Sequence, residues 1–264
     1  MESMSQLLAI MARLRDPEGG CPWDQRQTYA TIAPYTLEEA YEVADAIQRG
    51  DMAELRDELG DLLFQIVFYS QIAAEEGHFG FADVARGICD KMIRRHPHVF
   101  ADAEYADDIQ LRQAWEAKKA EERAERDAAV ETSQMDGVAR ALPALIRAEK
   151  LQKRAARVGF DWPDARGAFD KTREELDEVQ AEIRSGDQSR LQDELGDLLF
   201  AMVNVVRLLG MDAEQALSRA NEKFERRFRD MERTLKRDGE QMREMSLAEL
   251  DAAWEAAKQR ESGT

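Results

Sequence analysis

The chain has 264 residues, 44% of them hydrophobic, which is enough for one large or two small domains with packed cores. Its 54 acidic and 37 basic residues give a net charge of −17, which argues against broad binding to nucleic acids or membranes, because both need a basic surface. No segment approaches the roughly 20 apolar residues that span a bilayer, and the N-terminus has no basic region followed by an apolar one, so we expect a soluble, cytoplasmic protein.

Helical spacing of apolar residues, among good helix formers, runs through nearly every segment of the chain. No convincing run of alternating β-branched residues interrupts it, so the sequence predicts an all-α fold. In chain order, the predicted helices span 3–14, 35–49, 52–76, 81–95, 108–125, 138–157, 165–185, 188–209, 212–236 and 247–259.

Two Gly-Asp dipeptides separate pairs of long predicted helices. They are Gly50-Asp51 and Gly186-Asp187. Glycine is the usual residue at the end of a helix, and aspartate caps the start of the next one. Each dipeptide therefore predicts a tight turn at the centre of an antiparallel helix pair.

The chain contains a long internal repeat. At an offset of 136 residues, 37–64 match 173–200 without a gap, and the eight residues 57–64 recur unchanged as 193–200. Farther on the offset drifts, but Lys91 and Arg95 recur as Lys223 and Arg227, and Trp115 and Lys119 recur as Trp254 and Lys258.

A repeat unit on the order of 100 residues has the size of a domain. The sequence therefore predicts two homologous domains, residues 1–119 and 137–264. The segment 120–136 between them is rich in charge and poor in large apolar residues, which is typical of an exposed linker.

Four carboxylates lie symmetrically about each turn glycine. Glu178 and Glu194 are eight residues from Gly186, and Glu175 and Asp197 are eleven residues from it. At a rise of about 1.5 Å per residue, each pair lies at one depth on facing helices, and residues i and i+3 share a helix face. The same count about Gly50 selects Glu39, Glu42, Glu58 and Asp61.

This pattern favours a metal site over an ordinary acidic surface. A single Glu-x-x-Glu on a helix is usually a solvated face. Asp61 and Asp197, however, interrupt apolar runs, and clustered carboxylates repel one another unless a cation compensates them. All the ligands are hard oxygens, so we expect Mg²⁺, with Mn²⁺ as a possible substitute.

These motifs resemble the signature of the MazG-like, all-α nucleoside triphosphate pyrophosphatases. The resemblance covers almost the whole chain and includes residues 20–24, 154–162 and 221–228. It implies Mg²⁺-dependent hydrolysis of nucleoside triphosphates at the α–β linkage, giving a monophosphate and pyrophosphate with broad base specificity. It also implies that Glu174 or Glu175 orients or deprotonates the attacking water.

In this interpretation, basic residues of the last two helices bind the nucleotide. Lys223, Arg226 and Arg227, with Lys258, neutralise the triphosphate, and Trp254 stacks on the base or ribose. Two structural alternatives stay open. The basic residues are also typical of a salt-bridged surface helix, and Trp254 of a packing residue that closes a bundle.

The two copies differ around the carboxylates. Lys171 corresponds to Tyr35 in the first copy, and Arg190 corresponds to Glu54. Both differences favour substrate binding by the second site, where Lys171 and Arg190 add positive charge. The helix that carries Arg95 also ends at a His-Pro pair, whereas its counterpart continues. We therefore expect the second domain to carry most of the activity.

Two other functions remain compatible with the sequence, namely a base-selective dUTP- or dCTP-type pyrophosphatase and a non-enzymatic helical interaction module. In every case, a two-helix hairpin buries too little apolar surface to stand alone. We therefore expect four-helix bundles completed by homodimerisation, and we expect no nucleic-acid or membrane partner.

Overall fold

A computed structural model describes residues 2–262 except 102, 104, 108, 112–113, 116, 119–121 and 123–132. All regular structure in the described residues is helical, so the predicted all-α class is confirmed. The chain forms two compact units, residues 1–128 and 129–264. No helix in the described ranges is long and apolar enough to cross a membrane.

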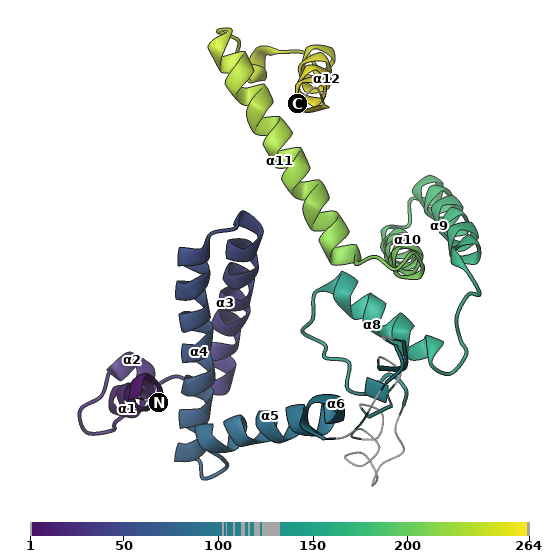
Figure 1. Ribbon diagram of the computed structural model, residues 1–264. Coiled ribbons are helices and arrows are strands. Elements are labelled where there is room, and N and C mark those ends of the chain that lie inside the picture. Colours follow the sequence, from purple (N-terminus) through teal and green to yellow (C-terminus); the bar gives the residue numbers. More distant parts are fainter. Residues whose placement is uncertain are drawn as a thin grey trace. The chain divides into compact units, whose positions relative to one another are not determined.

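Unit 1 is built on an antiparallel pair of long helices, α3 and α4, which lie side by side (Figure 1). Helix α1 packs against α4, and α5 follows α4 after a short turn. The helices are α1 (Glu2–Leu14), α2 (Pro22–Gln25), α3 (Tyr29–Arg49), α4 (Met52–Glu75), α5 (Phe81–Arg95) and α6 (Pro97–Phe100).

Unit 2 repeats this arrangement with α9 and α10 as its antiparallel pair and α8 packed against α10. Helix α11 contacts α8 and α10 and also pairs with the last helix, α12. The elements are α8 (Ala144–Ala156), α9 (Ala165–Ser185), α10 (Gln188–Leu208), α11 (Ala213–Arg237), the short 3₁₀ helix η1 (Met242–Glu244) and α12 (Leu247–Ser262).

Both predicted turns are confirmed. Gly50 and Gly186 have φ angles of 69° and 78°, in the left-handed region that glycine adopts without strain. The side chain of Asp51 accepts hydrogen bonds from two backbone N–H groups at the start of α4, and Asp187 does the same for α10. The hairpins that carry the carboxylates therefore have the same turn chemistry.

Two predicted helix starts are wrong. Helix α3 begins at Tyr29 rather than at residue 35, because Thr28 and Thr31 form a reciprocal capping box and Pro34 is accommodated inside the helix. Helix α8 begins at Ala144 rather than at residue 138, directly after Pro143. The predicted helix 108–125 lies partly outside the described residues, as does much of the predicted linker 120–136.

The packing of the two units differs. In the described part of unit 1, an apolar cluster of Met11, Ile32, Val67, Phe68 and Ile72 is contributed by α1, α3 and α4. Unit 2 has two smaller clusters, one of Ala148, Val203 and Ala213, and one of Met231, Leu235 and Ala257. The packing of unit 2 therefore relies on smaller side chains where its first helix meets the hairpin.

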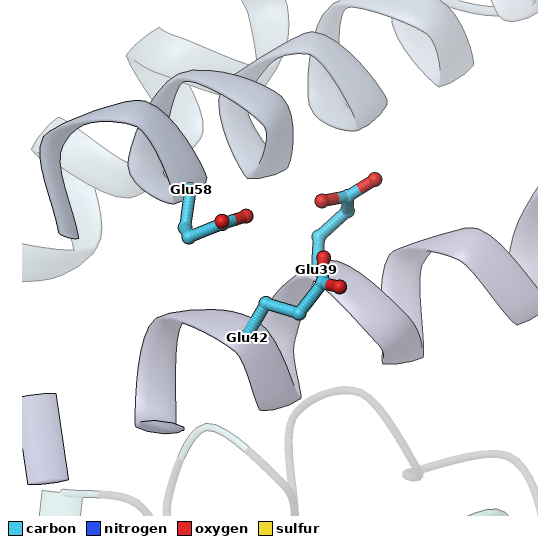
Figure 2. Close-up of side chains that lie close together, drawn as sticks. All are labelled: Glu39, Glu42 and Glu58. Carbon is cyan, nitrogen blue, oxygen red and sulfur yellow. The ribbon is translucent and has the colours of Figure 1, made fainter. Parts of the chain in front are cut away.

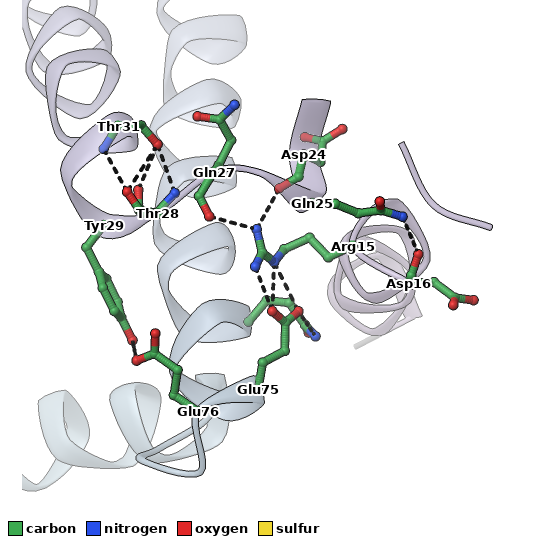
Figure 3. Close-up of polar contacts among 11 residues, drawn as sticks. Arg15, Asp16, Asp24, Gln25, Gln27, Thr28, Tyr29, Thr31, Glu75 and Glu76 are labelled. Carbon is green, nitrogen blue, oxygen red and sulfur yellow. Dashed lines mark hydrogen bonds and ion pairs between the residues drawn. The ribbon is translucent and has the colours of Figure 1, made fainter. Parts of the chain in front are cut away.

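A buried arginine fixes the loop before α3 in unit 1 (Figure 3). The guanidinium of Arg15 donates hydrogen bonds to both oxygens of the Glu75 carboxylate, the shortest at 2.6 Å, and to the backbone oxygens of Asp24, at 2.6 Å, and Gln27, at 3.3 Å. It also lies 5.3 Å from the centroid of the Phe68 ring. One side chain thus joins the end of α4, the loop and the core.

Candidate metal and nucleotide site

The hairpin of unit 1 brings three carboxylates together. Glu39 and Glu42 on α3 and Glu58 on α4 each offer an oxygen, and these oxygens lie within 4.8 Å of one another. In Figure 2 the three side chains point into the space between the two helices. Burial, followed by the charges of Asp61 and Glu42, raises the pKa of Glu39 above its ordinary value.

The hairpin of unit 2 forms the corresponding cluster from Glu175 on α9 and Glu194 and Asp197 on α10, also within 4.8 Å. Glu175 is only 5% exposed. The pKa of Glu178 is raised by desolvation and by the neighbouring Glu175 carboxylate. Carboxylates crowded in this way favour the binding of a proton or a cation.

Each set of four predicted residues is thus brought together as three close carboxylates and a neighbour. Asp61 in unit 1 and Glu178 in unit 2 lie outside the closest groups of three. Asp61 nevertheless raises the pKa values of Glu39 and Glu58, and Glu194 raises that of Glu178. The donor set is entirely carboxylate oxygen, which fits a hard divalent cation such as Mg²⁺.

Lys171 is a basic residue in contact with the carboxylates of unit 2. Its Nζ lies 2.8 Å from Glu174 and 2.7 Å from Glu175. The two contacts raise the pKa of Lys171, so the ammonium stays charged. The residue at the matching position of unit 1 is Tyr35, which instead has an edge contact with the ring of Trp23. The sequence prediction that Lys171 neighbours this site agrees with its position.

Arg190 does not contact the carboxylate cluster in the described structure. Its guanidinium lies 3.7 Å from Asp187, the residue that caps α10, and its side chain is exposed. In unit 1, Glu54 pairs with Arg49 at 2.5 Å, and its charge contributes to the raised pKa of Glu58. Glu54 therefore adds negative charge near the carboxylates of unit 1, as its position in the sequence predicts. Arg190 instead lies beside the turn of unit 2.

A contact between arginines and a glutamate joins α11 to α12. Arg226 and Arg227 both pair with Glu261, and these contacts lower the pKa of Glu261. Unit 1 has the same arrangement, in which Arg94 and Arg95 pair with Glu122 at 2.7 and 2.5 Å. The predicted phosphate-binding arginines are thus held by an acidic partner.

Glu122 and Glu261 were not selected from the sequence as site residues. The sequence nevertheless contains a pattern that identifies them. Each glutamate follows the repeated tryptophan, Trp115 or Trp254, by seven residues. Seven residues are two helical turns, so Trp254 and Glu261 share one face of α12.

The remaining predicted nucleotide-binding residues lie on α11 and α12. Lys223 is exposed. Lys258 pairs with Glu255 at 2.7 Å. Trp254 packs beside the cluster of Met231, Leu235 and Ala257, and its ring centroid lies 5.1 Å from that of Phe224. This position fits the alternative in which Trp254 is a packing residue. Its contact with Phe224 is with an exposed residue of α11. Lys119, the counterpart of Lys258, lies outside the described residues.

Comparison with known proteins gives a consistent result. The model of the MazG nucleotide pyrophosphohydrolase domain matches residues 27–100 and 168–231, once in each unit. A nucleoside triphosphate pyrophosphohydrolase of Escherichia coli (strain K12) is 54% identical over 99% of both chains. The nucleoside triphosphate pyrophosphohydrolase/pyrophosphatase MazG of Thermotoga maritima is 42% identical over 96% of this chain and 94% of its own. A nucleoside triphosphate pyrophosphohydrolase of Mycobacterium tuberculosis is 38% identical over 60% of this chain and 46% of its own.

The fold and the duplicated clusters define an all-α protein with two hairpin sites suited to divalent cations. The comparisons identify the family within this class of all-α proteins. The chain belongs to the MazG nucleotide pyrophosphohydrolase family, and it is an enzyme. The expected family is therefore confirmed, and the alternative of a non-enzymatic interaction module is set aside.

Proposed function

We propose that this protein hydrolyses nucleoside triphosphates to nucleoside monophosphates and pyrophosphate, with broad base specificity. The observation that carries the proposal is the pair of matched carboxylate clusters on hairpins that each match the family domain. The names of the relatives support the same substrate class. The products follow when water attacks the α-phosphorus and the bond to the bridging oxygen breaks.

We further propose Mg²⁺ as the cofactor, with Mn²⁺ as a substitute. Glu175, Glu178, Glu194 and Asp197 are the residues that would hold it, and Glu39, Glu42, Glu58 and Asp61 form the corresponding set. When bound, such a cation neutralises phosphate oxygens and makes water a stronger nucleophile. The fit rests on the all-oxygen donor set and on the raised pKa values of Glu39, Glu58 and Glu178.

The residues beside the cluster have separable roles in this proposal. Glu174 or Glu175 accepts a proton from the attacking water or orients it. Lys171, held between these two carboxylates, neutralises charge on the phosphate chain. Lys223, Arg226, Arg227 and Lys258 bind the β- and γ-phosphates, which requires the arginines to exchange Glu261 for phosphate. Arg190 belongs to the same proposed set, although its side chain pairs with Asp187.

Unit 2 is proposed as the main catalytic unit. Support comes from Lys171, which has a tyrosine as its counterpart, and from Glu54, which adds negative charge beside the first cluster. The test compares Glu178→Gln with the matched variant Glu42→Gln in the full chain, following pyrophosphate release with Mg²⁺. Glu178→Gln is expected to lose at least about 100-fold in rate and Glu42→Gln less than about threefold. Loss of activity only in Glu42→Gln would reverse the assignment.

A base-selective dUTP- or dCTP-type pyrophosphatase is the competing function. A panel of eight ribo- and deoxyribonucleoside triphosphates, each assayed with Mg²⁺ and with EDTA, separates the two. Similar kcat/KM values across the panel support broad specificity. A preference above about 100-fold for one pyrimidine would support the selective enzyme. Cytoplasmic localisation and homodimerisation belong to the same proposal.

A further inference from the structure

We propose that Gln65 is a further ligand of the carboxylate cluster of unit 1, and that it makes this cluster prefer a hard cation larger than Mg²⁺, such as Ca²⁺. The inference rests on the cation site proposed for unit 1 and does not require catalysis there. Gln65 lies on α4, four residues after Asp61 and seven after Glu58, so the three side chains share one face of the helix. The opposing helix α3 carries Glu39 and Glu42, which face Glu58 across the hairpin (Figure 2).

The amide of Gln65 is buried beside the cluster, since only 7% of the residue is exposed. Its Nε2 donates a long hydrogen bond of 3.5 Å to Glu39 Oε1, so the amide group lies next to one of the three close carboxylates. Its Oε1 is buried and has no partner among the described residues. A buried amide oxygen without a partner is costly, and a cation held by Glu39 and its neighbours would satisfy it.

The next polar layer of the hairpin does not supply the missing partner. Thr36 comes three residues before Glu39, and Tyr69 comes four residues after Gln65. Their hydroxyl groups are joined by a hydrogen bond of 2.7 Å, and the Thr36 hydroxyl donates to the backbone oxygen of Ile32 at 3.4 Å. Each hydroxyl group has one hydrogen, so Tyr69 donates to Thr36 and both hydrogens are used. The unpaired oxygen of Gln65 therefore requires a partner from outside this layer.

Unit 2 lacks this amide. At the offset of 136 residues, Gln65 corresponds to Ala201, which is buried and offers no side-chain oxygen. One carboxylate of unit 2 also has a cationic partner already, because the Nζ atom of Lys171 lies 2.7 Å from Glu175. The residue of unit 1 that corresponds to Lys171 is Tyr35, which carries no positive charge. The cluster of unit 1 therefore offers more ligand oxygens to a cation than the cluster of unit 2.

The number and type of these ligands separate the two cations. Mg²⁺ keeps several of its waters and is usually held by few carboxylates together with phosphate oxygens. Ca²⁺ binds about six to eight oxygen atoms and accepts amide oxygens and bidentate carboxylates among them. The three close carboxylates of unit 1, with Asp61 and the amide oxygen of Gln65, would supply most of such a set. The cluster of unit 1 therefore suits Ca²⁺ as a structural cation that is bound without a nucleotide.

Calorimetric titration of the full chain with Ca²⁺ or Mg²⁺, in the absence of nucleotide, tests this inference. We expect the unaltered protein to bind Ca²⁺ at least about tenfold more tightly than Mg²⁺. Glu58→Gln is expected to remove this Ca²⁺ site, whereas the matched variant of unit 2, Glu194→Gln, is expected to keep it. Gln65→Met keeps the volume of the side chain without its amide and is expected to weaken Ca²⁺ binding at least about tenfold.

Gln65→Glu distinguishes a cation ligand from a residue that only orients Glu39. A glutamate at this position keeps an oxygen but has no N–H group to donate. Binding of Ca²⁺ by Gln65→Glu at least as tight as in the unaltered protein is therefore expected of a ligand, whereas an orienting role predicts the same loss as in Gln65→Met. Gln71→Met is the matched control, because Gln71 of the same helix donates to Glu75 rather than to the cluster.

Three results would each overturn the inference: tighter binding of Mg²⁺ than of Ca²⁺ by the unaltered protein, unchanged Ca²⁺ binding in Gln65→Met, or equal losses in Gln65→Met and Gln65→Glu. The first needs no variant, so it holds even if a substitution prevents folding. Thermal unfolding is the second readout, because Ca²⁺ should raise the Tm of the unaltered protein and of Gln65→Glu more than that of Gln65→Met. Pyrophosphate release by the unaltered protein tests the proposed function separately, since Ca²⁺ binding in unit 1 does not depend on turnover.

Discussion

At the residue scale, Lys171 has two opposing effects on the site. Its ammonium contacts Glu174 and Glu175, so it competes with a cation for Glu175 while adding positive charge for phosphate. We expect Lys171→Met to tighten Mn²⁺ binding a few-fold and to lower kcat/KM for nucleoside triphosphates at least about tenfold. Metal titration by electron paramagnetic resonance and a pyrophosphate assay provide the two readouts.

Tighter Mn²⁺ binding together with a lower kcat/KM would distinguish a phosphate-binding role of Lys171 from a structural role. Arg173→Met is the control, because Arg173 pairs with Asp170 on the exposed face of the same helix. If Lys171→Met weakened both metal binding and turnover in parallel with a loss of thermal stability, Lys171 would be a packing residue rather than a phosphate ligand.

Glu122 allows a prediction about pH. Arg95 and Arg94 lower the pKa of Glu122 to about 2 from the usual 4.5. A carboxylate with a depressed pKa in the folded state contributes stability above pH 4.5 and loses it as the pH falls toward 2, since the unfolded chain takes up the proton first. We expect the unfolding free energy to decrease more between pH 5 and pH 3 in the original protein than in Glu122→Gln.

Urea denaturation at the two pH values measures this difference. Glu76→Gln serves as the control, because Glu76 is an exposed glutamate whose hydrogen bond comes from Tyr29 rather than from an arginine. Equal losses of stability in the original protein and in Glu122→Gln would show that the ion pairs with Arg94 and Arg95 do not persist in solution.

The residue scale also shows which parts of the site were predictable. The carboxylates follow from counting along one hairpin, because helical rise and periodicity fix which residues on adjacent helices meet. The partner of Arg227 does not follow from such a count. Glu261 lies 34 residues away on another helix, and the connection between the two helices, which includes η1, follows no simple period. The pocket of unit 2 that Gln152, Phe160 and Asn204 line could not be predicted either, since these residues come from three segments.

At the element scale, two glycines of one hairpin should respond oppositely to the same substitution. Gly186 has a φ of 78°, whereas Gly196 lies inside α10 without a positive φ. At both positions, no described atom beyond the neighbouring backbone lies within 4 Å of the point that an added Cβ would occupy. Gly186→Ala is expected to destabilise unit 2 by about 1 kcal/mol because of backbone strain. Gly196→Ala is expected to stabilise it by about 0.5 kcal/mol.

Guanidinium denaturation of both variants tests this expectation. The two substitutions add the same methyl group, so general effects of side-chain size cancel in the comparison. Destabilisation by Gly196→Ala would mean that another surface approaches α10 closely at that point, since no described side chain and no other described segment does.

One error at the element scale, the start of α3, came from side-chain capping rather than from hydrophobic periodicity. The predicted range of this helix begins at residue 35, directly after Pro34. The helix instead begins at the capping box of Thr28 and Thr31. The four-residue helices α2 and α6 were also absent from the prediction, because one turn is too short to show an apolar period.

At the scale of the whole molecule, duplication preserved the hairpins and allowed the packing around them to change. Both hairpins keep the glycine turn, the aspartate cap and three close carboxylates. The helix packed on each hairpin differs, with Met11 and Phe68 filling the core in unit 1 and Gln152 and Asn204 leaving a pocket in unit 2. Comparison of the copies therefore separates the features that the hairpin requires from those that differ between the two units.

Apolar residues exposed on both hairpins support the proposed homodimer. Ile47 and Leu59 in unit 1 and Ile183 and Leu195 in unit 2 occupy matching positions, and all four are at least 44% exposed. Leu199 on α10 is 59% exposed. A bundle formed with a second copy would bury these side chains and stabilise both hairpins, because the hydrophobic contribution is roughly 25 cal/mol per Å² of apolar surface removed from water.

We therefore expect a mass near twice 30.1 kDa by light scattering, and a shift toward the monomer in Leu199→Glu, because an unpaired charge is costly at an apolar interface. Gln180→Glu adds the same charge at an exposed polar position of α9 and should remain dimeric. A monomeric mass for the original protein would contradict the proposal, and each hairpin would then need another partner for its apolar face. A dimeric Leu199→Glu protein would instead place the interface away from this face of α10.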